Sequence, residues 1–245
     1  MRIKEKITDI DYGETRQFFK NRADKFQEDN PYSVTMYQDN NKELVKRRNR
    51  EEIDKLLPLL HLNEGSKVLD IACGIGRWAD ALPDEIAEYC GVDFSSELIE
   101  IASGRNIKKN FTFLEGAATE LEDVLGRSGK GKYNAVLMIG ILIYLNDADI
   151  ISALEQIEKR CEEHTVICIR EPVGVQERLT LKEFFSDELK DNYNAIYRNR
   201  KELVEFFDEA FIKKGFCITE EGVLFDEDAL NNRKETVQYY YILER

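Results

Sequence analysis

Short apolar runs alternate with amphipathic stretches from residue 67 onward, and this alternation constrains the fold more than any other feature of the chain. The runs that are long enough for one buried strand each are 67–71, 87–92, 111–114, 133–138 and 165–169. Two of the intervening stretches, 95–103 and 147–161, carry apolar residues at helical spacing. Such alternation predicts βαβ units with right-handed crossovers, which place helices on both faces of a mainly parallel sheet.

The segments on either side of this repeat follow other patterns. Two predicted helices, 14–26 and 41–60, precede the first strand and are separated by the helix-breaking Pro31. After the fifth strand, helical stretches at 180–189 and 199–212 interrupt the repeat. The last two runs, 216–219 and 236–243, have the pattern of closing strands.

We therefore predict an α/β fold with a Rossmann-like seven-stranded mixed sheet, mainly parallel with an antiparallel last strand, and helices on both faces. Residues 1–62 are expected to form an N-terminal helical cover of the same domain. Residues 63–245 are expected to form the main body, with a helical insertion near 175–212.

The composition narrows the classes of function. A formal net charge of -13 disfavours the electrostatic capture of nucleic acid, which depends on clustered Lys and Arg. Residues 1–11 lack the continuous apolar stretch of a signal peptide or membrane span, so we expect a cytoplasmic protein without a membrane span. Five scattered cysteines and two histidines offer little material for a metal centre, so we expect none. With nucleic acid, a membrane span and a metal centre disfavoured, we expect the partner to be a small molecule.

The segment from Asp70 to Trp78 is the main candidate for a ligand site. It runs from a strand into a turn that contains Gly74 and Gly76, where a ligand can approach the backbone closely, and then into a predicted helix. The same stretch with Ala79 also satisfies the pattern G-x-G-x-x-A, which is compatible with dinucleotide binding. An ordinary strand-to-helix turn without a ligand is the simpler alternative.

Two acidic residues sharpen this interpretation. Asp93 ends the second strand, where a carboxylate can accept hydrogen bonds from both hydroxyls of a ribose. Asp70 lies four residues before Gly74, where a carboxylate can organise the loop or stabilise a cationic group but would repel a pyrophosphate. Together they favour a nucleoside that carries positive charge over a dinucleotide.

The chain resembles the class I S-adenosylmethionine-dependent methyltransferases, whose loop has the form D-x-x-C/G-G-x-G. The match is Asp70-Ile71-Ala72-Cys73-Gly74-Ile75-Gly76, followed by Asp93 in Gly91-Val92-Asp93-Phe94-Ser95, and the resemblance extends over residues 67–245. It implies that S-adenosyl-L-methionine is the cofactor, that Gly74 and Gly76 line its methionine part, and that Asp93 holds its ribose. An acidic residue that the family often carries after the third strand is replaced here by Glu115-Gly116-Ala117-Ala118, so we assign the adenine contact to Ala117 and Ala118.

The predicted cofactor site includes further residues from the same strand ends and from the cover. Phe94 could lie over one face of the adenine or pack in the core. Tyr37, in the aromatic segment between the first two helices, could shield the cofactor from water or pack those helices together. The complete predicted cofactor set is Asp70, Ala72, Gly74, Gly76, Trp78, Asp93, Phe94, Ala117, Ala118, Met138 and Tyr37.

Acceptor residues are expected at the carboxyl ends of the fourth and fifth strands. Glu171 follows the fifth strand and could act as a general base, or could simply pair with a neighbour; Tyr144 is the second predicted catalytic residue. The predicted substrate-binding residues offer aromatic faces and guanidinium groups, and a solvated helix start is their alternative explanation. They are Arg170, Tyr193, Tyr197 and Arg198.

The sequence thus predicts a metal-independent methyltransferase that O-methylates a small molecule, with a sugar, nucleotide-sugar or terminal saccharide as the leading acceptor. Carboxylic acids, amines and protein side chains stay open as acceptors. A nucleotide-dependent oxidoreductase and a pseudoenzyme that only binds the cofactor are the rival hypotheses. The sequence predicts no oligomeric state.

Overall fold

The computed structural model describes residues 1–36, 41–187, 189–231 and 233–245. Its main sheet has seven strands in the order β4-β3-β2-β5-β6-β10-β9. The strands β2 to β6 are parallel, and β10 runs antiparallel between β6 and β9. Their bounds are β2 Lys67–Ile71, β3 Glu88–Asp93, β4 Phe111–Glu115, β5 Tyr133–Ile139, β6 Cys161–Gly174, β9 Cys217–Val223 and β10 Thr236–Glu244. The predicted fold class is confirmed.

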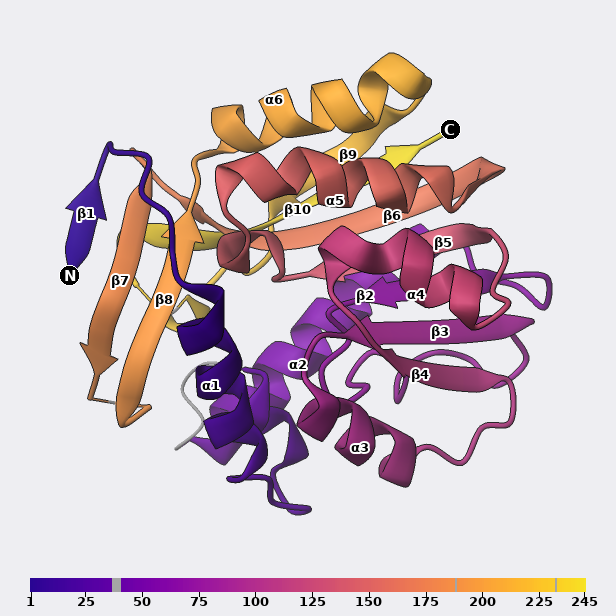
Figure 1. Cartoon of the computed structure of the whole chain (residues 1–245), viewed down its shortest axis with the longest axis horizontal. Coiled ribbons are helices and arrows are strands. Elements are labelled where there is room, and N and C mark those ends of the chain that lie inside the picture. The colour runs from indigo at the N-terminus through magenta and orange to yellow at the C-terminus, as the bar shows by residue number, and fades with distance from the viewer. Residues whose placement is uncertain (37–40, 188, 232) are drawn as a thin grey trace.

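Helices cover both faces of this sheet. One face packs against α4 (Leu121–Arg127), α5 (Asp147–Lys159) and α6 (Arg200–Ala210), which Figure 1 shows side by side. The other face packs against α2 (Lys42–Leu56), the 3₁₀ turn η2 (Leu57–Leu60) and the segment around Trp78. Because successive strand residues point to opposite faces, Leu69 and Ile71 belong to the first core and Val68 to the second.

The helices predicted at 41–60, 95–103, 147–161 and 199–212 are present. In α3 (Ser96–Arg105) the side chain of Ser95 accepts a hydrogen bond from the backbone N–H of Leu98, which is the expected N-cap. The helix predicted after the glycine loop is wrong: residues 72–81 form consecutive turns. This segment holds Trp78 and Arg77 against α2, and Pro83 follows it.

A second sheet replaces part of the predicted helical insertion. The strands β1 (Arg2–Lys4), β7 (Leu179–Ser186) and β8 (Asp191–Tyr197) form an antiparallel sheet in the order β1-β7-β8. It stands beside the main sheet, with the N-terminus along β7 (Figure 1). The helix predicted at 180–189 is therefore wrong: Leu179 and Leu181 of β7 instead pack in one cluster with Phe18 of α1 (Tyr12–Ala23) and Tyr193 of β8. The predicted first helix corresponds to α1, but the cover as a whole also contains strand β1.

One partly buried carboxylate joins the second sheet to the main one. Asp147, at the start of α5, receives hydrogen bonds from Arg178 and from Arg198, which precede β7 and follow β8. Arg198 also donates to the backbone oxygens of Leu142 and Leu145. These contacts fix the loop after β5 and the strand β8 relative to each other, and both of them border the cavity described next.

Candidate functional site

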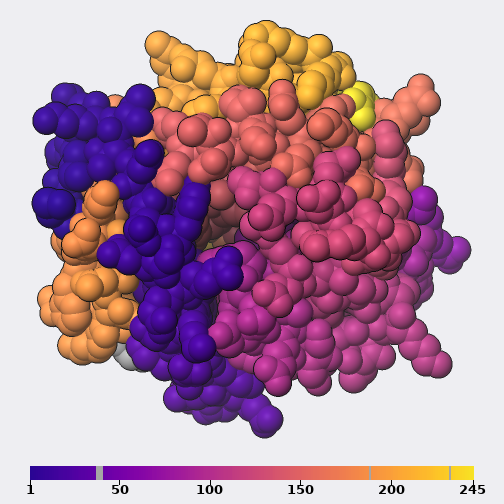
Figure 2. Space-filling view, in the orientation of Figure 1, coloured from indigo at the N-terminus to yellow at the C-terminus, as the bar shows by residue number. Residues whose placement is uncertain are grey.

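A cavity of about 280 Å³ lies over the carboxyl ends of the main-sheet strands, beneath the N-terminal cover. Its walls come from the strand ends, from α1, α2 and the segment after the 3₁₀ turn η1 (Pro31–Val34), and from β8 and β10. Figure 2 shows N-terminal residues lying across this face beside those of β7 and β8, with a hollow where they meet the body. Open α/β sheets bind ligands at this edge.

The glycine loop brings backbone to the cavity wall. Ala72 and Gly74 line the cavity, and both have a left-handed backbone, with φ of 61° and 56°. A Cβ added at Gly74 would lie 2.6 Å from the Cγ2 of Thr35 in the cover, so this position requires glycine. Gly76 has a φ of 77° and lies against the ring of Phe113 rather than in the cavity wall. The loop is thus shaped by the cover on one side and by the sheet on the other.

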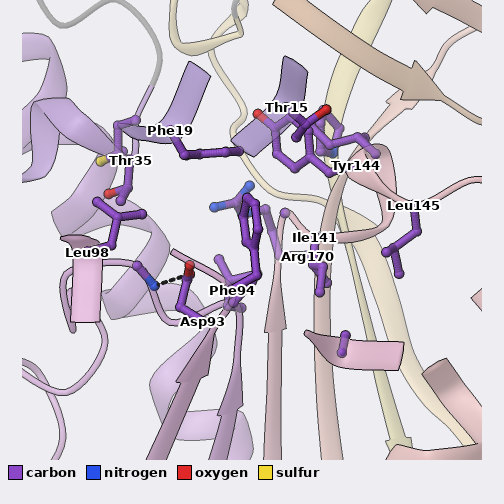
Figure 3. A pocket seen from close by; sticks show the side chains of 18 of the residues that line it. Thr15, Phe19, Thr35, Asp93, Phe94, Leu98, Ile141, Tyr144, Leu145 and Arg170 are labelled. Atoms are coloured by element: carbon purple, nitrogen blue, oxygen red, sulfur yellow. Dashed lines mark hydrogen bonds between the residues drawn. The ribbon is translucent and has the colours of Figure 1, made fainter. Parts of the chain in front are cut away.

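Asp93 lies beside this loop at the end of β3. One of its carboxylate oxygens, Oδ2, accepts a hydrogen bond of 2.9 Å from the backbone N–H of Gly74 (Figure 3). The other, Oδ1, accepts one of 3.0 Å from the backbone N–H of Ser95. Burial raises the pKa of Asp93 to about 6, and the two backbone hydrogen bonds oppose that rise. Each oxygen keeps a further lone pair, so the carboxylate can still accept hydrogen bonds from two hydroxyls of a ligand.

The predicted adenine contacts lie on the same side of the cavity. Phe94, Ala117 and Ala118 all line it, together with Leu98 of α3. The ring of Phe94 packs edge-to-face against Phe19 of α1 at a centroid distance of 5.7 Å, so it links the sheet to the cover. Figure 3 shows Asp93, Phe94 and Leu98 on one side and Phe19 and Tyr144 opposite. This apolar slot beside a carboxylate suits a nucleoside.

Besides Gly76, three predicted cofactor residues do not reach the cavity. Asp70 is buried on the far side of the loop, where it accepts a hydrogen bond from the hydroxyl of Tyr89, and burial raises its pKa to about 7. Trp78 packs in the core on the α2 side, and Met138 packs in the core beneath α5. Their contacts position the loop and strands. The remaining predicted residue, Tyr37, lies outside the described residues.

The predicted catalytic and acceptor residues divide into two groups. Tyr144, Tyr193 and Tyr197 line the cavity, and their hydroxyl oxygens form a chain with successive distances of 3.2 Å. Arg170 also lines it. Arg198 is buried around Asp147 and the loop after β5, so it supports the wall from behind.

Glu171 is buried on the opposite side of β6 from Arg170. Its Oε1 accepts a hydrogen bond of 2.8 Å from the backbone N–H of Leu142, in the 3₁₀ turn η4 (Leu142–Tyr144). Burial raises its pKa to about 7, while the backbone N–H groups of the loop and Arg170 oppose the rise. In this structure Glu171 holds the loop that carries Tyr144.

Two charged residues of α2 line the cavity and were not predicted. Arg48 and Glu52 share the buried stripe of this helix with Val45 and Leu56. Charged residues in the apolar stripe of a helix are a signal that sequence reading could have used, since a buried charge needs a partner or a ligand. Glu52 contacts Arg77, Trp78 and Arg170, all of which are distant from it in the sequence.

Comparison with known proteins identifies the family. Residues 42–216, more than half of the chain, match the family model described as a methyltransferase domain. The chain belongs to this methyltransferase family. The matched segment begins at α2 and ends after α6, so it includes the glycine loop, Asp93 and most of the cavity wall.

Two curated relatives match a shorter segment of this methyltransferase. A demethylmenaquinone methyltransferase of Bacillus licheniformis is 35% identical over 72 residues, which are 28% of this chain and 31% of the relative. The corresponding protein of Bacillus pumilus is 31% identical over 74 residues, 28% of this chain and 32% of the relative. The chain thus spans about a third of the length of the curated relatives that it matches.

Solved structures of methyltransferases share the fold. A Leishmania major S-adenosylmethionine-dependent methyltransferase has a TM-score of 0.60 at 14% identity, over 92% of this chain and 82% of that one. A phosphoethanolamine N-methyltransferase of Haemonchus contortus, solved with phosphoethanolamine and S-adenosylhomocysteine, has a TM-score of 0.67 at 18% identity, over 94% and 48%. A Synechocystis magnesium protoporphyrin IX methyltransferase, solved with the cofactor, has a TM-score of 0.56 at 15% identity, over 83% of each chain.

The resemblance to class I methyltransferases is therefore confirmed, and S-adenosyl-L-methionine is confirmed as the cofactor of this family. The residues present suit this group, because the glycine-shaped loop, the apolar slot and a carboxylate with free lone pairs border one cavity. Among the described residues, no helix is long and apolar enough to cross a membrane.

Proposed function

We propose that this protein is an S-adenosyl-L-methionine-dependent methyltransferase that acts on a small-molecule acceptor. The observation that carries the proposal is the hydrogen bond between Asp93 and the backbone N–H of Gly74 at the wall of the cavity. It couples the glycine loop to a buried carboxylate that can receive ribose hydroxyls. When bound, the cofactor supplies a methyl group that its sulfonium has already activated.

The chain's own residues supply binding, orientation and exclusion of water. Gly74 and Ala72 would receive the amino-acid part of the cofactor, Asp93 its ribose, and Phe94 with Ala117 and Ala118 its adenine. The cover, through Thr35 and Phe19, closes the cavity above them. Holding two reactants in one orientation removes much of the entropic part of the barrier.

Of the two predicted catalytic residues, the geometry favours Tyr144. Its ring lines the cavity and its hydroxyl is 3.2 Å from that of Tyr193, so it can orient an acceptor hydroxyl by a hydrogen bond. Glu171 acts on the acceptor only through the loop that it holds. The tyrosine hydroxyls in the cavity wall are compatible with O-methylation of a sugar, and we keep sugars as the leading acceptor class. The names of the similar proteins reported above indicate other acceptors.

The test is cofactor binding followed by methyl transfer. S-Adenosylhomocysteine should bind the wild type in calorimetry, and Asp93→Asn should weaken that binding strongly. Mass spectrometry of the purified protein and a screen of sugar acceptors with labelled cofactor would then identify the product. Binding of NADH in place of S-adenosylhomocysteine would refute the proposal.

The turns at residues 72–81 count against the rival oxidoreductase, because a pyrophosphate site of that kind uses the N-terminus of a regular helix after the glycine loop. The pseudoenzyme hypothesis predicts cofactor binding without transfer to any acceptor. In that case Tyr144→Phe would change nothing measurable.

A further inference from the structure

A buried cluster of three charged residues lies at the end of the cavity that faces α2. Glu52 is 1% exposed, and its Oε1 accepts hydrogen bonds from Arg77 Nη2 at 2.5 Å and from the indole of Trp78 at 3.0 Å. Its Oε2 lies 2.8 Å from Arg170 Nε. Burial alone would favour the neutral acid, but Arg170 and Arg77 hold the pKa of Glu52 below its ordinary value.

The charges of this cluster do not balance. Glu52, with its lowered pKa, carries one negative charge, while the guanidinium groups of Arg77 and Arg170 carry one positive charge each. The three side chains together therefore carry one net positive charge. Arg77 directs both of its terminal nitrogens at neighbours, Glu52 and Asn49, and it does not line the cavity. Of these two arginines, Arg170 is the one that faces the cavity.

Arg170 makes little use of its hydrogen-bonding capacity. Its side chain is 14% exposed, and its Nε is close to Glu52 but not aligned to donate to it. Nη1 is 3.3 Å from the Oε1 of Gln238, and Nη2 has no hydrogen-bond partner among the described residues. A guanidinium that is mostly removed from water and makes so few hydrogen bonds is stabilised by an anion from outside the chain.

The position of Arg170 assigns that anion to the acceptor rather than to the cofactor. The residues that would hold the cofactor lie after β2, at the end of β3 and after β4, whereas Arg170 lies on β6, level with the end of β5. In the order β2-β5-β6 it is two strands away from the glycine loop, or about 10 Å at the usual strand spacing. Gly140 at the end of β5 leaves room for it, since a Cβ there would lie 3.0 Å from Nη1.

We propose that Arg170 selects a methyl acceptor that carries an oxyanion, a carboxylate or a phosphate, and that Glu52 positions its guanidinium. This inference rests on the proposed function and deepens it. The planar guanidinium matches two oxygens of either group, and the amide of Gln238 lies beside it in the cavity wall. Sugar acids and sugar phosphates satisfy this requirement, as do other small acids, whereas an uncharged sugar does not.

Calorimetry with small anions tests the inference without knowledge of the acceptor. The wild type saturated with S-adenosylhomocysteine is titrated with orthophosphate, with acetate and with the neutral isostere acetamide. We expect both anions to bind with a millimolar Kd and acetamide not to bind. Arg170→Gln should weaken anion binding at least tenfold, and Arg170→Lys, which keeps the charge beside Glu52 but loses the fork, should weaken it less.

Arg47→Gln is the matched control, because Arg47 lies on α2 but pairs with Glu51 and Glu227 at the surface. It should leave anion binding unchanged. Anions that fail to saturate the wild type, or that bind Arg170→Gln equally well, would overturn the inference. Acetamide binding as tightly as acetate would also overturn it.

Two further titrations distinguish the inference from a cofactor-binding role of Arg170 and from a failure of the proposed function. One outcome is that Arg170→Gln weakens the binding of S-adenosylhomocysteine but not that of methylthioadenosine, which lacks the carboxylate. Arg170 then binds the carboxylate of the cofactor, and the inference fails. If the wild type does not bind S-adenosylhomocysteine, the proposed function fails instead. The anion titration of the unloaded protein then still decides whether Arg170 forms an oxyanion site.

Discussion

The affinity for S-adenosylhomocysteine should depend on pH through Asp93. Its carboxylate already accepts one backbone hydrogen bond on each oxygen, from Gly74 and from Ser95, and only the ionised form has lone pairs for both ribose hydroxyls as well. Burial raises the pKa of Asp93 to about 6. Affinity should therefore be full above this value and should fall as the pH drops through it.

The magnitude follows from the fraction of ionised carboxylate. With a pKa of about 6, about one-tenth of the protein is ionised at pH 5, so the apparent Kd should rise about tenfold between pH 7 and pH 5. With the ordinary value of 3.8, the rise would be less than about a tenth. Asp93→Asn keeps one acceptor oxygen and loses one charge-assisted hydrogen bond of about 1.5 to 3 kcal/mol, so its Kd at pH 7 should rise about ten- to a hundredfold.

Isothermal titration of S-adenosylhomocysteine at several pH values between about 5 and 8 measures both effects. Asp93→Asn should show weak binding with little dependence on pH. Asp70→Asn is the matched control, since Asp70 also has a raised pKa but faces Tyr89 rather than the cavity, so its variant should keep the wild-type pH dependence. A wild-type Kd that is equal at pH 5 and pH 7, or a steep dependence that survives in Asp93→Asn, would refute the reasoning.

Three other perturbations have outcomes that the structure defines. Gly140→Ala places a side chain at a φ of 79° and close to the guanidinium of Arg170. The free energy of unfolding in urea should therefore fall by about 1 kcal/mol or more, and an unchanged unfolding midpoint would contradict this. Glu171 has a folded pKa of about 7, above its ordinary 4.5, so its contribution to stability is present at low pH and is lost as the pH rises through 7. The decline in unfolding free energy between pH 5.5 and 8 should be about 2 kcal/mol smaller in Glu171→Gln than in the wild type, and equal slopes would show that Glu171 does not titrate there. Asp147→Ala removes the carboxylate that pairs with the buried guanidinium of Arg198 and leaves Arg178 only Glu202, so it should cost about 3 kcal/mol in the same assay, whereas a loss below about 1 kcal/mol would mean that solvent reaches Arg198.

The parallel core was predictable from the sequence because its strands are buried on both faces. The run at 67–71 is β2 with the same bounds, and the runs at 111–114 and 133–138 are each within one residue of a strand. Such strands read as continuous apolar segments between amphipathic helices. The carboxylate at the cavity wall was predictable for a related reason, since Asp93 is the polar residue that ends such a run.

The second sheet was not predictable in this way. Its first strand, β1, is three residues long and pairs with β7, which lies far away in the sequence. No local sequence pattern therefore predicts β1. The apolar residues of β7 are compatible with either period over so short a stretch, and packing on α1 decides for a strand. The partnership of Glu52 with Arg170 was missed for a similar reason, because the two residues meet only in the folded chain.

The period of a strand decides which of two adjacent charged residues can meet a ligand. Arg170 and Pro172 line the cavity, while Glu171 between them points to the opposite face, where Ile169 and Val173 belong to the core beneath α5. A site that includes both Arg170 and Glu171 is therefore excluded by strand geometry, whatever their chemistry suggests. Glu171, predicted as a base, instead holds the loop of Tyr144, and of the two adjacent residues only Arg170 lines the cavity.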